Sequence, residues 1–136
     1  MTLTTQQRSE LIQASLSVRE HAYAPYSGYQ VGAALLGDDG EIYTGVNVEN
    51  AAYPLSMCAE RGAIFKAVSQ GVRAFEGISI ASENGGSPCG GCRQVLSEFG
   101  LDMPVLVVNA SGEVTLETTV AGLLPHAFTP AHLPKP

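Results

Sequence analysis

Apolar and polar residues alternate along the chain with two different periods, and the changes of period mark the expected elements. A helix-like spacing of apolar residues predicts an amphipathic helix over residues 5–21. The segment YAPYSGY interrupts this spacing and is expected to form a loop. Two apolar runs, residues 31–36 and 41–48, flank a turn-forming Gly-Asp-Asp-Gly cluster and therefore predict a β-hairpin.

Helices and strands are then expected to alternate. Ser56 is a suitable N-cap for a helix that ends at about Gln70. Residues 75–82 have the composition of a strand and lead into a glycine-rich loop. Cys89 is expected to open a second helix over residues 90–99, so the order of strand, loop and helix is repeated.

The C-terminal part predicts two further strands and a short helix. The strands, 103–109 and 113–118, are separated by an Asn-Ala-Ser-Gly turn, and the helix falls within residues 119–128, before a proline-rich tail. Helices placed between strands require crossover connections. We therefore predict an α/β fold, a three-layer α/β/α arrangement with a five-stranded mixed sheet covered on both faces.

Composition narrows the possible partners. The length of 136 residues suits a single domain spanning 1–136. Only 15% of residues are charged, which favours burial of surface in an oligomer. The net charge is -6 and the basic residues are scattered, which argues against a nucleic-acid partner. No signal-like leader or long apolar run is present, so we expect a cytoplasmic protein without a membrane partner.

Three cysteines suggest a metal site with an open position. Disulfides use cysteines in pairs, whereas closed structural zinc sites use four ligands. Cys58, Cys89 and Cys92 are all expected at helix starts, where thiolates form readily. They could hold a tetrahedral zinc whose fourth position takes water. A closed zinc site completed by a remote histidine and a thioredoxin-like redox role for the Cys-Gly-Gly-Cys segment are the alternatives.

Two neighbours of Cys58 favour catalysis over a structural or redox role. Glu60 lies two residues further on, near enough to move protons of a metal-bound water without binding the metal. Arg61 could donate a hydrogen bond to a thiolate and reduce the excess negative charge of a site with three sulfur ligands. From spacing alone, a solvated helical arginine is an equally good interpretation of Arg61.

The chain resembles the small zinc-dependent cytidine deaminases over nearly its whole length. Four segments carry the resemblance in the family's order: PYSGYQVGAAL, GVNVENAAYPLSMCAER, SPCGGCRQVLSEF and LLPHAF. The family pattern of Cys-x-Glu followed by Pro-Cys-x-x-Cys is a general signature of zinc deaminases. The resemblance implies one zinc per chain with the three cysteines as ligands, Glu60 as proton shuttle and Arg61 as the arginine that tempers the charge of the thiolates. Ala59 would offer its backbone N–H to the pyrimidine carbonyl.

The resemblance also implies how the substrate is held. Asn47 and Glu49 match the ribose-binding pair, and strand periodicity places both on one face, with Val48 facing the core. Tyr29 stands where the family usually has Phe, and Phe128 matches an aromatic residue that reaches a neighbouring subunit's site. Without the resemblance, Asn47 and Glu49 could simply face solvent, and Phe128 could be an ordinary core residue.

These implications lead to one functional expectation. We expect hydrolytic deamination of cytidine and 2′-deoxycytidine to the corresponding uridines, in pyrimidine salvage, by a homotetramer whose active sites are completed by neighbouring subunits. Gly62 departs from the family, which often has Thr there, and it weakens the helix by about 1 kcal/mol relative to Ala. A deaminase of modified cytosine nucleosides, and a noncatalytic zinc or redox module, are the alternatives.

Overall fold

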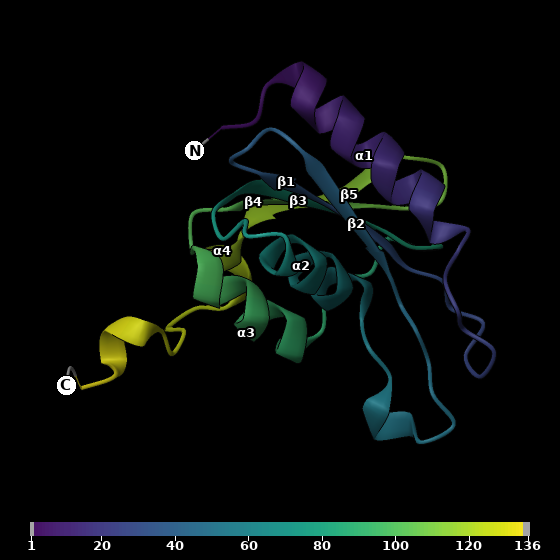
Figure 1. Cartoon of the computed structure of the whole chain (residues 1–136). Helices are drawn as coiled ribbons and strands as arrows, with labels where there is room; N and C mark the ends of the chain where they lie inside the picture. Colours follow the sequence, from purple (N-terminus) through teal and green to yellow (C-terminus); the bar gives the residue numbers. More distant parts are fainter. Residues whose placement is uncertain (1, 135–136) are drawn as a thin grey trace.

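The computed structural model describes residues 2–134 and shows a central sheet between two layers of helices (Figure 1). The elements follow one another as α1 (Thr5–Arg19), β1 (Gly32–Gly37), β2 (Ile42–Val46), a 3-10 turn (Tyr53–Leu55), α2 (Ala59–Ser69), β3 (Phe75–Ala81), α3 (Gly90–Phe99), β4 (Pro104–Val108), β5 (Val114–Thr119), α4 (Val120–Leu123) and a second 3-10 turn (Pro130–His132). Lys135 and Pro136, at the end of the expected proline-rich tail, lie outside the described residues. Within residues 2–134, no helix combines the length and the apolar character needed to cross a membrane.

The five strands form one mixed sheet in the order β2-β1-β3-β4-β5. Strands β1 and β2 pair as the expected hairpin, and Gly40 in its turn takes the left-handed φ of 83° that glycine tolerates. Strands β3 and β4 are parallel because α3 carries the chain from the end of one to the start of the other. The predicted mixed five-stranded sheet is confirmed.

Helices cover both faces of the sheet, which gives the predicted three layers. Helix α1 lies on one face, whereas α2 and α3 lie together on the other (Figure 1). Every residue of β1 is buried, because the strand lies between the two layers. Alternate residues of β1 therefore serve different cores: Ala34 and Leu36 pack with Leu11 of α1, while Leu35 packs on the side of α2.

Helix α2 begins later than the sequence predicted. Its N-cap is Cys58, and Ser56 instead ends the preceding 3-10 turn. Met57 forms an isolated antiparallel bridge with Val48, with N–O distances of 2.9 and 3.0 Å in the two directions. Because this bridge uses the backbone N–H and C=O of Met57, the helix cannot start before residue 58. This bridge thus sets where the cysteine lies on α2.

One other expectation was wrong in detail, because strand β2 ends at Val46 and Val48 is 49% exposed instead of facing the core. The predicted short helix within residues 119–128 is present and has four residues, Val120–Leu123. Pro125 explains why the helix ends here, because a residue before proline is driven out of the helical region, and Leu124 has a non-helical ψ of 73°.

Candidate metal centre and pocket

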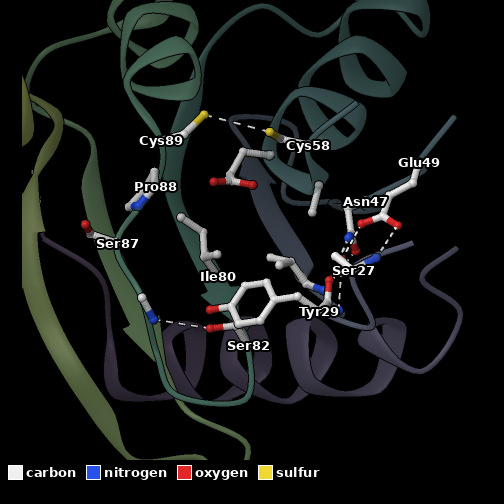
Figure 2. Close-up of a pocket in the computed structure, with 14 residues that line it drawn as sticks. Ser27, Tyr29, Asn47, Glu49, Cys58, Ile80, Ser82, Ser87, Pro88 and Cys89 are labelled. Carbon is white, nitrogen blue, oxygen red and sulfur yellow. Dashed lines mark hydrogen bonds between the residues drawn. The ribbon is translucent and has the colours of Figure 1, made fainter. Parts of the chain in front are cut away.

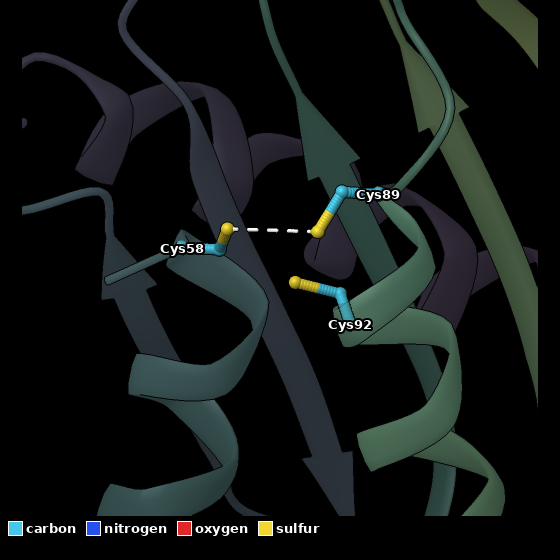
Figure 3. A group of neighbouring side chains, drawn as sticks. All are labelled: Cys58, Cys89 and Cys92. Carbon is cyan, nitrogen blue, oxygen red and sulfur yellow. Dashed lines mark hydrogen bonds between the residues drawn. The ribbon is translucent and has the colours of Figure 1, made fainter. Parts of the chain in front are cut away.

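The three cysteines come from the starts of two neighbouring helices (Figure 3). Cys58 and Cys89 are the N-cap residues of α2 and α3, and Cys92 lies in the first turn of α3. Neither N-cap side chain is used to cap its own helix, so both sulfur atoms are available to a ligand. The expected convergence of Cys58, Cys89 and Cys92 is therefore present in the fold.

The spacing of the sulfur atoms fits a metal ion. All three lie within 4.8 Å of one another, and the Sγ atoms of Cys58 and Cys89 are 3.8 Å apart. Sulfur ligands at about 2.3 Å from one tetrahedral zinc are roughly 3.8 Å from each other. All three cysteines are free thiols in this structure. Among residues 2–134, no further His, Cys, Asp or Glu belongs to the cluster.

Arg61 contacts the sulfur cluster directly. Its Nη2 donates a hydrogen bond of 3.1 Å to the Sγ of Cys58, and its buried Nε has no partner among the described residues. Hydrogen bonds from Cys92 and then from Arg61 lower the pKa of the Cys58 thiol to about 5, and the contact with Cys58 raises the pKa of Cys92. The contact with Cys58 also raises the pKa of Arg61, so this guanidinium stays charged. A half-buried cation aimed at sulfur suits a cluster that carries thiolate charge.

Glu60 presents a carboxyl group beside the cysteines. It lies in the first turn of α2, is only 5% exposed and lines the same pocket as Cys58. Burial is the main cause that raises its pKa, and the negative charge of Cys58 adds to the rise. A buried carboxyl group with a raised pKa holds a proton more readily than an exposed one, as a proton carrier requires.

A pocket of about 320 Å³ opens between the cysteines and the loop that precedes β1 (Figure 2). Seven of the residues singled out from the sequence line it: Tyr29, Asn47, Glu49, Cys58, Ala59, Glu60 and Cys89. Cys58 and Cys89 lie at one end, and Tyr29, Asn47 and Glu49 lie away from them (Figure 2). The pocket therefore has a chemically reactive end and a polar recognition end.

Asn47 and Glu49 hold the loop that forms the recognition end. They lie just beyond the end of β2, and both face the pocket instead of open solvent. The amide of Asn47 accepts from the N–H of Val31 at 2.9 Å and donates to the carbonyl of Tyr29 at 2.8 Å. Glu49 accepts the hydroxyl of Ser27, whose hydrogen bond chiefly lowers the pKa of the Glu49 carboxyl. Glu49 thus remains ionised at neutral pH.

The hydroxyl of Tyr29 has a specific partner. It donates a hydrogen bond of 2.7 Å to Oδ1 of Asn84, in the loop that follows β3. The phenol ring thereby joins two loops on either side of the pocket. The polar atom that distinguishes Tyr29 from Phe is satisfied within the chain.

Phe128 does not line the pocket of its own chain. Its side chain is 57% exposed, so it is not a core residue. The ring stacks on His132 with centroids 5.5 Å apart, and its carbonyl accepts from Gln94 at 2.9 Å. The C-terminal segment that carries it projects from the body of the molecule (Figure 1).

Sequence reasoning missed the serines that shape the pocket. Ser27 holds Glu49, and the buried Ser82 accepts hydrogen bonds from the N–H groups of Gly85 and Gly86 at 3.1 and 3.2 Å. These residues are small and polar and lie in loops, where no periodicity marks them. The glycine-rich composition of residues 82–91 was the only signal that a chain segment must turn closely around a ligand here.

Comparisons with known proteins agree with this geometry. Residues 5–108 match the family model described as cytidine and deoxycytidylate deaminase zinc-binding region. A cytidine deaminase of Sporosarcina psychrophila is 54% identical over 123 residues, covering 88% of this chain and 90% of that protein. A cytidine deaminase of Halalkalibacterium halodurans is 47% identical over 125 residues, covering 90% of this chain and 94% of the other.

A solved structure shares the fold. The crystal structure of a cytidine deaminase from Burkholderia pseudomallei superposes with a TM-score of 0.85 at 44% identity. The match covers 93% of this chain and 100% of that one. The likeness extends to the whole arrangement of sheet and helices.

Proposed function

Because the chain belongs to the cytidine and deoxycytidylate deaminase family, we propose that this pocket carries out the hydrolytic deamination of cytidine and 2′-deoxycytidine. The products are uridine or 2′-deoxyuridine and ammonia. The observation that carries the proposal is the buried carboxyl group of Glu60 in one pocket with sulfur atoms spaced as zinc ligands. A purely structural zinc site has no use for such an acid.

The charges of the pocket favour a free nucleoside. Among residues 2–134, its lining contains the carboxyl groups of Glu49 and Glu60 and no Lys, Arg or His. A phosphate group on the sugar would meet the ionised Glu49 without a cation to balance it. The substrate is therefore expected to be the nucleoside and not its 5′-phosphate or a polynucleotide.

The cofactor is zinc, and Cys58, Cys89 and Cys92 would hold it. When bound, the ion acts as a Lewis acid that activates water for attack on C4 of the cytosine ring. Arg61 donates to the sulfur of Cys58 and offsets part of the negative charge of the three ligands. The positive ends of α2 and α3 act in the same direction, because both N-termini point at the sulfur cluster.

Glu60 moves the protons of the reaction. It takes a proton from the attacking water, transfers it to N3 of the ring, and then delivers the second water proton to the departing amine. Ala59 occupies the first position of α2, where the backbone N–H has no partner within the helix. This N–H donates to the pyrimidine carbonyl and orients the ring.

The polar end of the pocket holds the sugar. Glu49 accepts hydrogen bonds from sugar hydroxyls. The amide of Asn47 uses one acceptor and one donor position to hold the loop, and its remaining positions can bind a sugar hydroxyl. Tyr29, held by Asn84, packs its ring against the nucleoside. Phe128 reaches the pocket of a neighbouring subunit in a homotetramer, since it lies away from its own.

Turnover of a nucleoside panel by zinc-loaded protein tests the proposal. Cytidine and 2′-deoxycytidine should lose the cytosine absorbance and release ammonia, with about one zinc per chain. Cytidine 5′-phosphate is the matched comparison and should react far more slowly. A protein that binds zinc but converts none of these substrates would contradict the proposal, and preference for a modified cytosine nucleoside would support the alternative deaminase.

A further inference from the structure

The side chain of Arg93 donates three hydrogen bonds, although its place in the sequence predicts no functional role. It follows Cys92 directly on α3 and is half-buried. Its Nε donates to the carbonyl of Pro88 at 2.8 Å, Nη2 to the hydroxyl of Ser87 at 2.9 Å, and Nη1 to the carbonyl of Leu123 at 2.8 Å. The planar guanidinium therefore connects the start of its own helix with the end of α4.

The first end of this connection is the segment that leads to a metal ligand. Ser87 and Pro88 line the pocket and immediately precede Cys89. Proline has no N–H, so its carbonyl is the only backbone polar group by which Pro88 can be held, and Arg93 holds it. Fixing this carbonyl restricts the direction in which the chain enters Cys89.

Cys89 needs such support more than the other two cysteines. Cys92 is buried in the helix, and Cys58 receives the hydrogen bond from Arg61, whereas Cys89 is exposed. Glycines lie on both sides, with Gly85 and Gly86 before it and Gly90 and Gly91 after it. Apart from Pro88, whose ring fixes φ, the loop before Cys89 therefore has little rotational restriction of its own.

The second end is anchored in the core. Leu123 is 7% exposed and belongs to the hydrophobic cluster between the sheet and the helices α2 and α3. Its carbonyl lies at the C-terminus of α4, where helix carbonyls lack partners and attract a cation. No carboxylate among residues 2–134 lies within ion-pair distance of Arg93, so carbonyl and hydroxyl groups alone orient it.

We propose that Arg93 is a positioning residue of the metal centre, which ties the loop of Cys89 to α4 and so holds Cys89 in the geometry that zinc requires. The inference rests on the zinc site of the proposed function but concerns metal retention, which is measured without substrate. A lysine keeps the charge but cannot reach three acceptors, and a glutamine keeps some hydrogen bonding without the charge.

Zinc release from the intact protein to an excess of a chromogenic chelator tests the proposal. Arg93→Gln and Arg93→Lys should both release zinc faster, on the order of tenfold or more, as expected when a residue that orients a ligand is lost. Arg73→Gln is the matched control, because Arg73 is exposed in the turn before β3 and makes no side-chain hydrogen bond among the described residues. Its release rate should equal that of the unchanged protein.

Cobalt substitution gives a second readout. The sulfur-to-cobalt absorption of Arg93→Gln should weaken or shift relative to the unchanged protein, while Arg73→Gln should leave it alone. If Arg93→Gln folds poorly, Arg93→Lys carries the test with the same expected results. Unchanged zinc release and an unchanged cobalt spectrum in a folded Arg93 variant would overturn the proposal, and so would full rescue by lysine. If the protein failed to deaminate cytidine, the rate of zinc release and the cobalt spectrum would still test the role of Arg93.

Discussion

Glu60 and Arg61 are adjacent on α2, and the same sulfur cluster affects their two side chains in opposite ways. The carboxyl group of Glu60 is buried beside a negatively charged sulfur cluster, which favours its protonated form. The guanidinium of Arg61 meets the same sulfur atoms and is held in its charged form. One turn of helix thus supplies both the carboxyl group that we propose as the proton carrier and a fixed positive charge.

Replacement of Glu60 by Gln separates proton transfer from metal binding. The amide has nearly the same shape but cannot carry the proton, so turnover should fall on the order of 10²- to 10⁴-fold. The zinc content should stay at the level of the unchanged protein, because Glu60 does not belong to the sulfur cluster. Steady-state kinetics with metal analysis measures both. Full activity in the variant would remove Glu60 from the mechanism.

The carboxyl group of Glu49 should make the stability of the folded protein depend on pH. The Ser27 hydroxyl, together with the N–H groups of Ser27 and Tyr26, lowers the pKa of Glu49 below its ordinary value of 4.5. A carboxyl group whose folded pKa is depressed stabilises the protein above its unfolded pKa, and this contribution disappears as the pH falls through the folded pKa.

Thermal melts of the unchanged protein and of Glu49→Gln measure this contribution. The unchanged protein should melt at the higher temperature near neutral pH, and the difference should shrink as the pH falls below about 4.5. Taking the difference between the two proteins removes the effects of the other carboxyl groups. A difference that is constant across this range would contradict the role of the ionised carboxylate.

At the scale of elements, α2 packs unusually closely on β2. A Cβ atom on Gly45 would lie 2.4 Å from both the carbonyl oxygen of Ala59 and the nitrogen of Ala63. Gly62 faces the same junction, but a Cβ there would lie no closer than 3.7 Å to the strand. Glycine is therefore required on the strand side and not on the helix side. At position 62, where the chain departs from the family pattern, the structure has room for a small side chain.

Two glycine variants test this difference. Gly45→Ala should lower the free energy of unfolding by about 1–3 kcal/mol, because the added methyl group forces the helix away from the strand. Gly62→Ala is the matched control and should be neutral or stabilising by up to about 1 kcal/mol, because alanine favours the helix. Urea unfolding measures both. Equal effects of the two variants would contradict the proposed close packing.

At the scale of the whole molecule, exposed apolar side chains point to assembly. Tyr53, Leu55 and Phe128 are 69%, 70% and 57% exposed. Exposed apolar groups of this size often mark contact surfaces. The homotetramer, the cytoplasmic location and the single domain over 1–136 remain predictions. Light scattering that finds a stable, active monomer would contradict the role of Phe128 in a neighbouring site.

Mixing two inactive variants tests the shared site directly. Phe128→Ala should lose activity because the neighbour's pocket is incomplete, and Glu60→Gln should lose it because the proton carrier is missing. In mixed assemblies, a Glu60→Gln subunit can supply Phe128 to a pocket that retains Glu60. Activity should therefore return when the subunits are unfolded and refolded together. Mixed tetramers without any activity would exclude the arrangement.

Short-range features of the sequence determined the order of elements and the set of candidate ligands. Hydrophobic periodicity reflects which face each helix or strand buries, and this is a local property. The confirmed predictions are the three-layer fold with a mixed sheet, the deaminase family and its activity, and zinc as the cofactor. The individual roles of Asn47, Glu49, Glu60 and the other site residues stay predictions, although the fold brings most of them into one pocket.

Contacts between distant segments decided the rest. The bridge between Val48 and Met57 moved the start of α2 to Cys58, and the bond from Tyr29 to Asn84 joins residues 55 positions apart. The three acceptors of Arg93 include a carbonyl 30 positions away. The sequence by itself specified which side chains could do the chemistry. Only the tertiary structure decided which hydrogen bonds hold them in place, because such bonds depend on where loops return to the sheet, and loops carry no periodic signal.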